Sequence, residues 1–138
     1  MTPNQIETVK DSFQQISQDT NAFSLTFYNE LFRMAPSLRG HFPTDMEDQR
    51  IKLAETLGAV VLHMHRLHLL EDTIMGLARR HLDYGAKPQH FAPVGAALIF
   101  ALNQHTPNGL TPIQAEAWAT AYGAISDLMI EAMVNAAA

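Results

Sequence analysis

The spacing of apolar residues restricts the possible folds of this chain more than any other feature does, because the spacing is that of helices along almost the whole sequence. Six stretches carry this spacing, at about 4–18, 20–34, 44–67, 70–84, 88–102 and from 112 onward. A short helical turn is expected between Pro36 and Phe42. No stretch alternates apolar and polar residues as a half-buried strand would. The pattern therefore predicts an all-α fold.

Several helix boundaries are marked by residues that suit one position. Threonine followed by proline is typical of a helix start, and it occurs at 2–3 and at 111–112. Thr44 and Glu47 match a capping box, so a helix is expected to begin at Thr44 and to run to about Leu67. Pro93 is expected to strain or delay the first turn of the helix that Pro88 opens.

The composition limits the class of protein. At 138 residues the chain is expected to form one domain, and 47% hydrophobic residues suffice for a packed core. A net charge of −5, without any basic run, argues against a nucleic-acid partner. The absence of cysteine from the sequence excludes disulfides, thiolate metal sites and a thiol nucleophile. Because no apolar run could span a membrane and no export signal is apparent, a cytoplasmic protein is expected.

Histidine is the residue type that most invites a functional interpretation. His63, His65 and His68 lie close in sequence, but a helix would place the first two about 160° apart, which disfavours a zinc site. Only His65 and His68 share a helical face. His81 lies on the apolar face of its helix. A histidine there can be a core residue bonded to a backbone carbonyl, or it can be a metal ligand. This helix alone leaves both interpretations open.

Other chemistry finds little support in the sequence. No nucleophile elbow, glycine-rich phosphate loop or evident carboxylate pair is present. Phenylalanines are concentrated between residues 23 and 42, with Tyr28 among them. Such a cluster suits a flat apolar cofactor, and it suits an ordinary core equally well.

Short motifs follow one another in a distinctive order along the chain. They are Phe27-Tyr28-Asn29-Glu30-Leu31-Phe32, Pro36, Phe42, Gln49, Leu53, Leu77-Ala78-Arg79-Arg80-His81, Val94-Gly95 and Ala117-Trp118-Ala119-Thr120-Ala121-Tyr122-Gly123. Together they resemble the globins, specifically the bacterial single-domain branch close to the globin part of flavohaemoglobins. The resemblance covers essentially the whole chain. It implies a globin fold, a three-on-three helical sandwich that encloses haem, with residues 1–138 as a single domain.

The resemblance also implies roles for individual residues. His81 would be the proximal ligand of haem b, with its other ring nitrogen donating to a backbone carbonyl such as that of Leu77. Tyr28 and Gln49 would face the opposite side of the iron and donate hydrogen bonds that slow dioxygen release. Phe42 would lie flat on the porphyrin, and Leu53 would limit the space for the ligand. Phe91 and Val94 would pack against the cofactor. The residues implied near the propionates are Lys52, Arg80 and Tyr84. Without a cofactor, Tyr28 would be a core aromatic, and Lys52 and Arg80 would be solvated charges.

Two departures from the flavohaemoglobins bear on the activity. In those globins a tyrosine and a glutamate pair with the proximal histidine, but Phe91 and Met133 stand at the matching positions here. His81 should then be a neutral imidazole, closer to that of an oxygen carrier than to that of a peroxidase. The flavin and nicotinamide domains are also missing from this sequence, so any turnover would need an external reductase.

Three functions follow as hypotheses. The first is a haem globin that binds dioxygen, nitric oxide and carbon monoxide, for oxygen storage or for nitric oxide dioxygenation with an external reductase. The second is a gas-sensing globin module of a longer signalling protein. The third is a cofactor-free helical interaction module whose phenylalanine-rich face binds a partner helix. The sequence gives no indication of the oligomeric state.

Overall fold

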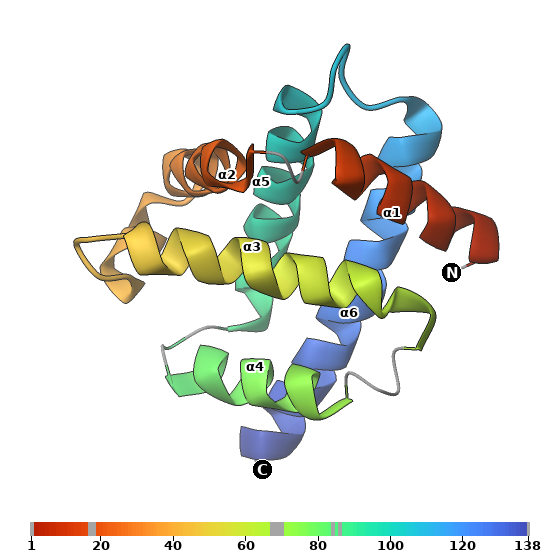
Figure 1. Cartoon of the computed structure of the whole chain (residues 1–138). Helices are drawn as coiled ribbons and strands as arrows, with labels where there is room; N and C mark the ends of the chain where they lie inside the picture. The colour runs from red at the N-terminus through yellow and green to blue at the C-terminus, as the bar shows by residue number, and fades with distance from the viewer. Residues whose placement is uncertain (1, 17–18, 67–70, 84, 86, 138) are drawn as a thin grey trace.

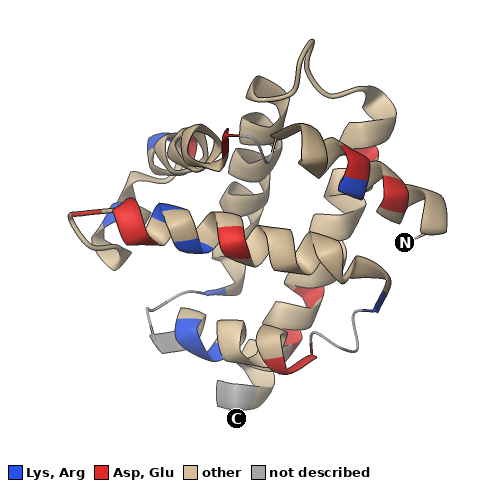
Figure 2. Ribbon diagram, in the orientation of Figure 1, with Lys and Arg blue, Asp and Glu red and all other residues tan. Residues whose placement is uncertain are grey.

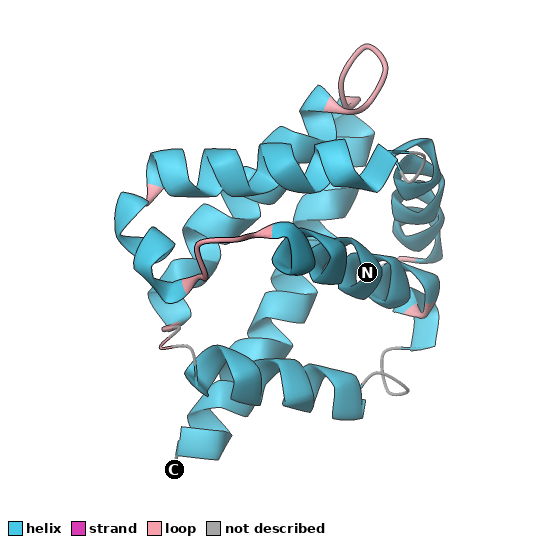
Figure 3. Cartoon of the chain, turned by 60° about the vertical axis from the view of Figure 1, so that its left-hand side comes forward, coloured by secondary structure: helices cyan, strands magenta, loops and turns pink. Residues whose placement is uncertain are grey.

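Helices account for nearly all of the computed structural model, which describes residues 2–16, 19–66, 71–83, 85 and 87–137. They are α1 (Pro3–Ile16), α2 (Thr20–Met34), η2 (Pro36–His41), α3 (Glu47–Leu62), α4 (Glu71–Asp83), η4 (Pro88–His90), α5 (Phe91–Gln104) and α6 (Pro112–Ala137), where η denotes a 3-10 helix. None of the described residues lies in a β-strand (Figure 3). The all-α prediction is confirmed.

The longest helix, α6, supports much of the molecule. It has 26 residues and contacts α1, α4 and α5. The other main contacts join α2 to α5 and to α3. In the view of Figure 1, α3 passes in front of α5 and α6, and α4 crosses α6 near the C-terminal end of the chain. No helix within the described ranges, α6 included, is long and apolar enough to cross a membrane.

Trp118 joins the two ends of the chain in the core. Its side chain is 2% exposed, and its Nε1 donates a hydrogen bond of 3.0 Å to Oγ of Ser12 on α1. Phe13 packs edge-on against the same indole, with ring centroids 6.4 Å apart. Because the buried N–H has a partner, the large apolar indole is buried without the cost of an unpaired donor.

Both threonine caps expected from the sequence are present. The Thr2 hydroxyl accepts from the Gln5 backbone N–H at 3.1 Å, and Oε1 of Gln5 accepts from the Thr2 N–H at 3.0 Å. Thr111 and Gln114 make the same reciprocal pair at the start of α6. Each pair satisfies two N–H groups that a helix start leaves without partners.

The predicted start of α3 at Thr44 is wrong, because the helix begins at Glu47 and follows Met46. A capping residue must offer its carbonyl to the first helical hydrogen bond. The Thr44 carbonyl instead accepts from the Arg39 guanidinium at 3.1 Å, as do the carbonyls of the two preceding residues. The Asp45 carboxylate accepts from the Glu47 N–H at 3.0 Å, while Met46, at the capping position, makes no side-chain cap.

The predicted end of α3 at about Leu67 is also wrong, since the helix ends at Leu62. A single 3-10 turn follows at residues 64–66, closed by a hydrogen bond of 2.9 Å from the Arg66 N–H to the His63 carbonyl. Met64 in this turn is 4% exposed and belongs to the main core. By contrast, the delay expected at Pro93 is confirmed, because the turn η4 precedes α5.

Candidate functional site

A cavity of about 170 Å³ lies between α3, α4, α5 and α6. Of the residues expected in a pocket, Leu53, Leu77, His81 and Val94 line it. The remaining lining residues are Phe27, Thr56, Leu57, Val60, Met64, Leu98, Trp118, Ala121, Tyr122, Ile125 and Met129. The cavity is therefore mainly apolar, and His81 is the one histidine among these described residues.

A hydrogen bond within α4 fixes the orientation of the His81 ring. Nδ1 of His81 lies 2.7 Å from the carbonyl oxygen of Leu77, one helical turn earlier. A carbonyl only accepts, so Nδ1 carries a proton, and Nε2 is the ring nitrogen left to offer a lone pair to a metal. The Phe91 ring stacks on the imidazole with centroids 6.3 Å apart and an interplanar angle of 23°. Histidine ligands of metals are held in this way, by a hydrogen bond at the other ring nitrogen.

The surroundings of His81 are apolar on the side of α6. Met133 is 2% exposed and clusters with Ala78, Ala132 and Phe91. The backbone carbonyl of Phe91 accepts from the Tyr122 hydroxyl at 2.7 Å. In the described part of the chain, the Leu77 carbonyl is thus the hydrogen-bond acceptor that the His81 ring meets.

Tyr28 and Gln49 come together from α2 and α3. The Gln49 side-chain amide donates to the Tyr28 hydroxyl at 3.2 Å. The Tyr28 ring is 6% exposed and packs among Phe27, Phe32 and Phe42, with centroids 4.9, 6.0 and 5.7 Å away. Burial raises the pKa of the phenol, and the hydrogen bond from Gln49 offsets part of that rise. The hydroxyl therefore stays protonated, and its own proton is available to a further acceptor.

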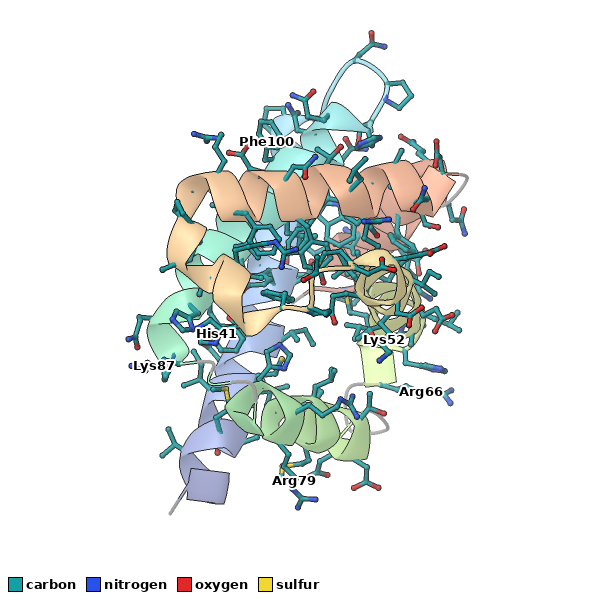
Figure 4. All side chains as sticks on the ribbon, turned by 90° about the vertical axis from the view of Figure 1, so that its left-hand side faces the viewer. His41, Lys52, Arg66, Arg79, Lys87 and Phe100 are labelled. Carbon is teal, nitrogen blue, oxygen red and sulfur yellow. The ribbon has the colours of Figure 1, made fainter. Side chains whose placement is uncertain are left out.

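The residues expected to meet charged groups of a cofactor lie at the surface where the structure describes them. Lys52 and Arg80 are exposed, and the structure gives neither an ion-pair partner among the described residues. Figure 4 places Lys52 and Arg66 on one side of the molecule, and His41 and Lys87 on the opposite side. Tyr84 lies outside the described residues. Phe42 contacts Tyr28 and Phe32 and does not line the cavity.

The histidines after α3 do not gather in the part of the chain that the structure describes. Nε2 of His65 lies 3.2 Å from Nζ of Lys10, His63 is exposed, and His68 lies outside the described residues. Within the described ranges, no group of three or more His, Asp or Glu side chains is placed to hold a metal ion.

Most of the cavity lining was not identified from the sequence. Leu57, Met64 and Ile125 lie on the same apolar stripes that form the core, and spacing does not distinguish a pocket wall from a core contact. The resemblance supplied only the residues of its own motifs. The position of Met64 also depends on the 3-10 turn after α3, which was not predicted.

The residues present fit a flat apolar metal complex such as haem. The Nε2 lone pair of His81 would bind the metal, and apolar side chains from α3 and α5 would contact the rest of the complex. The cavity is smaller than the roughly 300–1,000 Å³ of most cofactor sites. It therefore accounts for only part of the volume of such a ligand.

The fold and the site together define a class, namely helical proteins in which crossed helices enclose an apolar pocket with one histidine on its wall. Residues 25–129 match the Globin family. The chain belongs to the globin family, and the predicted resemblance and globin fold are confirmed. Membership of this family implies the binding of haem and of small gases.

Similar proteins come from bacteria and from fish. Neuroglobin-1 of Oncorhynchus mykiss is 26% identical, over 88% of this chain and 86% of its own. A flavohemoprotein of Deinococcus radiodurans is 30% identical over 94% of this chain, which spans only 33% of that protein. A bacterial globin from Campylobacter jejuni has the same fold, with a TM-score of 0.89, 22% identity and 99% of each chain covered. The similarity to neuroglobins was not foreseen from the motifs.

Proposed function

We propose that the chain binds haem b with His81 as the axial ligand, and that it retains dioxygen through Tyr28 and Gln49. The observation that carries this proposal is the hydrogen bond of 2.7 Å between Nδ1 of His81 and the Leu77 carbonyl. That bond leaves the lone pair of Nε2 on a ring that lines an apolar cavity. Residues 1–138 would form a single globin domain, as the full coverage of the Campylobacter jejuni globin suggests.

Haem, when bound, supplies an iron centre that binds dioxygen, nitric oxide and carbon monoxide. Leu53, Leu77 and Val94 would hold its apolar surface and keep water away. Phe42 and Phe91 would complete the apolar contacts, one beside Tyr28 and the other beside His81. The exposed charges of Lys52 and Arg80 are available to the propionates.

Tyr28 and Gln49 would act as hydrogen-bond donors to the bound gas. The Gln49 amide meets the Tyr28 hydroxyl at 3.2 Å, so the two groups are adjacent, and neither lines the cavity at His81. A hydrogen bond to a charged acceptor contributes roughly 1.5–3 kcal/mol, which corresponds to roughly 10- to 100-fold slower release. This arrangement suits retention of dioxygen better than rapid delivery.

The contacts of His81 favour reversible gas binding. Phe91 and Met133 cannot accept a proton from the imidazole, so no anionic partner polarises the ring, whose Nδ1 donates to the Leu77 carbonyl. A neutral ligand pushes less electron density onto the metal than an anionic one does. Oxygen storage is thus the use that these residues support best, in a cytoplasmic protein.

A second candidate function is nitric oxide dioxygenation. It is favoured by the flavohemoprotein relatives, which are about three times as long as this chain and whose name points to a flavin beside the haem. The present chain would need an external reductase to return the haem to its starting state. A nitrate yield that depends on an added reductase would support this use over storage alone.

Replacement of His81 tests the haem proposal. We expect the wild type to take up haem with a strong violet absorption band, and His81→Gly to lose most of that band because the axial ligand is gone. Added imidazole should restore the band by filling the space of the lost side chain. His63→Gly, at an exposed histidine on the same chain, should leave haem uptake unchanged. The proposal would be contradicted if His81→Gly, without imidazole, took up as much haem as the wild type.

A further inference from the structure

A second hollow, separate from the cavity at His81, lies between the start of α4 and the C-terminal half of α6. Its volume is about 390 Å³. It is lined by Glu71, Ile74, Met75, Leu128, Glu131, Ala132 and Asn135. Ile74 and Ala132 are 4% and 5% exposed and form its floor. This volume is large enough to receive side chains of another molecule. We refer to these seven residues as the α4–α6 groove.

The rim of the α4–α6 groove is acidic. Glu71 and Asp72 occupy the first turn of α4, and Asp127 and Glu131 are exposed on α6. In the ribbon of Figure 2, acidic positions are coloured at the start of α4 and along α6, while the basic positions of α4 lie at its other end. Among the described residues, no Lys or Arg lines the groove, and the recorded ion pair lies elsewhere, on α2. Both charged side chains that line the groove, Glu71 and Glu131, are therefore acidic.

The α4–α6 groove also exposes apolar surface. Leu128 on its wall is 38% exposed, and Val134, further along α6, is 58% exposed. An apolar centre with a charged rim is the usual anatomy of a protein interface. A grooved face of this kind fits the apolar side of an amphipathic helix.

We propose that the α4–α6 groove docks a basic amphipathic helix of a partner protein. Leucine-like side chains of the partner would fill the groove over Ile74 and Ala132, and its Lys or Arg would face Glu71 and Glu131. A second copy of this chain suits the groove less well, because each copy has a net charge of −5. This proposal stands on the groove alone and does not depend on haem binding.

The floor of the α4–α6 groove is also in contact with the lining of the His81 cavity. Ile74 packs in one cluster with Met129 and Leu77. Met129 and Leu77 line the cavity, whereas Ile74 lines the groove. A docked helix would therefore touch a side chain that packs directly against the wall of the site around His81.

The test uses the full chain and a synthetic helical peptide of about 15 residues built from Leu, Lys and Ala. A second peptide with Glu in place of every Lys is the charge control. We expect the Lys peptide to bind in calorimetry with an affinity that falls as salt is added, and the Glu peptide not to bind. No binding of the Lys peptide, or equal binding of both peptides, would overturn the proposal.

Paired variants locate the binding surface. The double variant Glu71→Lys with Glu131→Lys should weaken binding roughly tenfold or more, because two attractions become repulsions. The control, Glu7→Lys with Glu116→Lys, makes the same change in net charge at exposed glutamates on α1 and α6 outside the groove. It should change the affinity less than about twofold. If both double variants weaken peptide binding equally, the peptide is held by the net charge of the protein, and the proposal of binding at the groove is overturned.

The apolar part of the contact has its own matched pair. Leu128→Ala should weaken binding several-fold, while Leu25→Ala, at a leucine on α2 that is 45% exposed, should not. Thermal melts establish that each variant is folded. Sedimentation measures whether the chain associates with itself. If Glu131→Lys abolishes such self-association, the occupant of the groove is a second copy of this chain, and the proposal of a partner protein is contradicted.

Discussion

Gly95 and Tyr122 show how closely two helices approach beside the proposed haem site. A Cβ at Gly95 on α5 would lie 2.7 Å from Cε2 of Tyr122 on α6. The tyrosine has little freedom to move away, because its hydroxyl donates to the Phe91 carbonyl at 2.7 Å. Burial also raises the pKa of that phenol, so it remains a donor. A glycine is therefore required at residue 95 for packing.

This contact predicts opposite effects at two helical glycines. Gly95→Ala should destabilise the fold by roughly 1–3 kcal/mol, since the new methyl group overlaps a fixed ring. Gly123→Ala should stabilise it by roughly 0.5–1 kcal/mol, because nothing lies within 4 Å of a Cβ there and alanine favours the helix. Urea unfolding of both variants measures the difference. A stabilised Gly95→Ala protein would show that the ring of Tyr122 is not held as described.

At the scale of elements, two histidines join η2 to η4. The rings of His41 and His90 lie with centroids 5.9 Å apart, at an interplanar angle of 54°. Nδ1 of His90 accepts from the Lys87 backbone N–H at 3.0 Å. Burial lowers the pKa of His90 below its ordinary value of 6.5, and the nearby His41 and Lys87 lower it further. Their positions in the sequence, 49 residues apart, give no sign that the two histidines meet.

The lowered pKa of His90 predicts a loss of stability in mild acid. Below pH 6.5 the unfolded chain takes up a proton at this residue more readily than the folded chain does. The contribution of His90 is therefore complete above pH 6.5 and is lost as the pH falls through the lower folded-state pKa. His90→Asn keeps an acceptor for the Lys87 N–H and cannot titrate, so its melting temperature should fall less in acid.

The control for this pH effect is His63→Asn, at an exposed histidine directly after α3. Its melting temperature should follow the wild type from neutral pH into acid. If His90→Asn and the wild type lose the same stability over that range, the contact between η2 and η4 has no part in the acid response.

Local sequence patterns predicted the helices, whereas contacts between residues further apart in the sequence determined where some of them begin. The Thr2 and Thr111 caps were predictable because both partners lie within one helical turn. The start of α3 was not, since it depends on the Arg39 guanidinium reaching the Thr44 carbonyl from η2. A capping pattern describes one short segment only and cannot show a competing donor outside it.

The same distinction applies to the candidate site. The contact of His81 with the Leu77 carbonyl, within one turn of α4, was expected from the resemblance to globins. The contact between Tyr28 and Gln49 joins two helices and was not predicted; the resemblance to globins implied only that both face the same side of the iron. The cavity walls around Leu57 and Met64 were not predicted, because core and pocket residues share the same apolar spacing.

At the scale of the whole molecule, family membership and the site support a single account. The globin fold places His81 on one wall of an apolar cavity, and α2 and α3 bring the Tyr28 hydroxyl to the Gln49 amide. The chain spans only about a third of its flavohemoprotein relatives but 86% of a neuroglobin. Retention of a gas by these donors is therefore the property that most directly tests the proposal.

The dissociation rate of dioxygen from the reduced, haem-loaded protein measures that retention. Tyr122→Phe is the matched control, because it makes the same chemical change at a hydroxyl already engaged with the Phe91 carbonyl. We predict slow release from the wild type and from Tyr122→Phe, and release that is roughly 10- to 100-fold faster from Tyr28→Phe. A Tyr28→Phe protein that releases dioxygen at the wild-type rate would contradict the account, because the phenol would then not touch the bound gas.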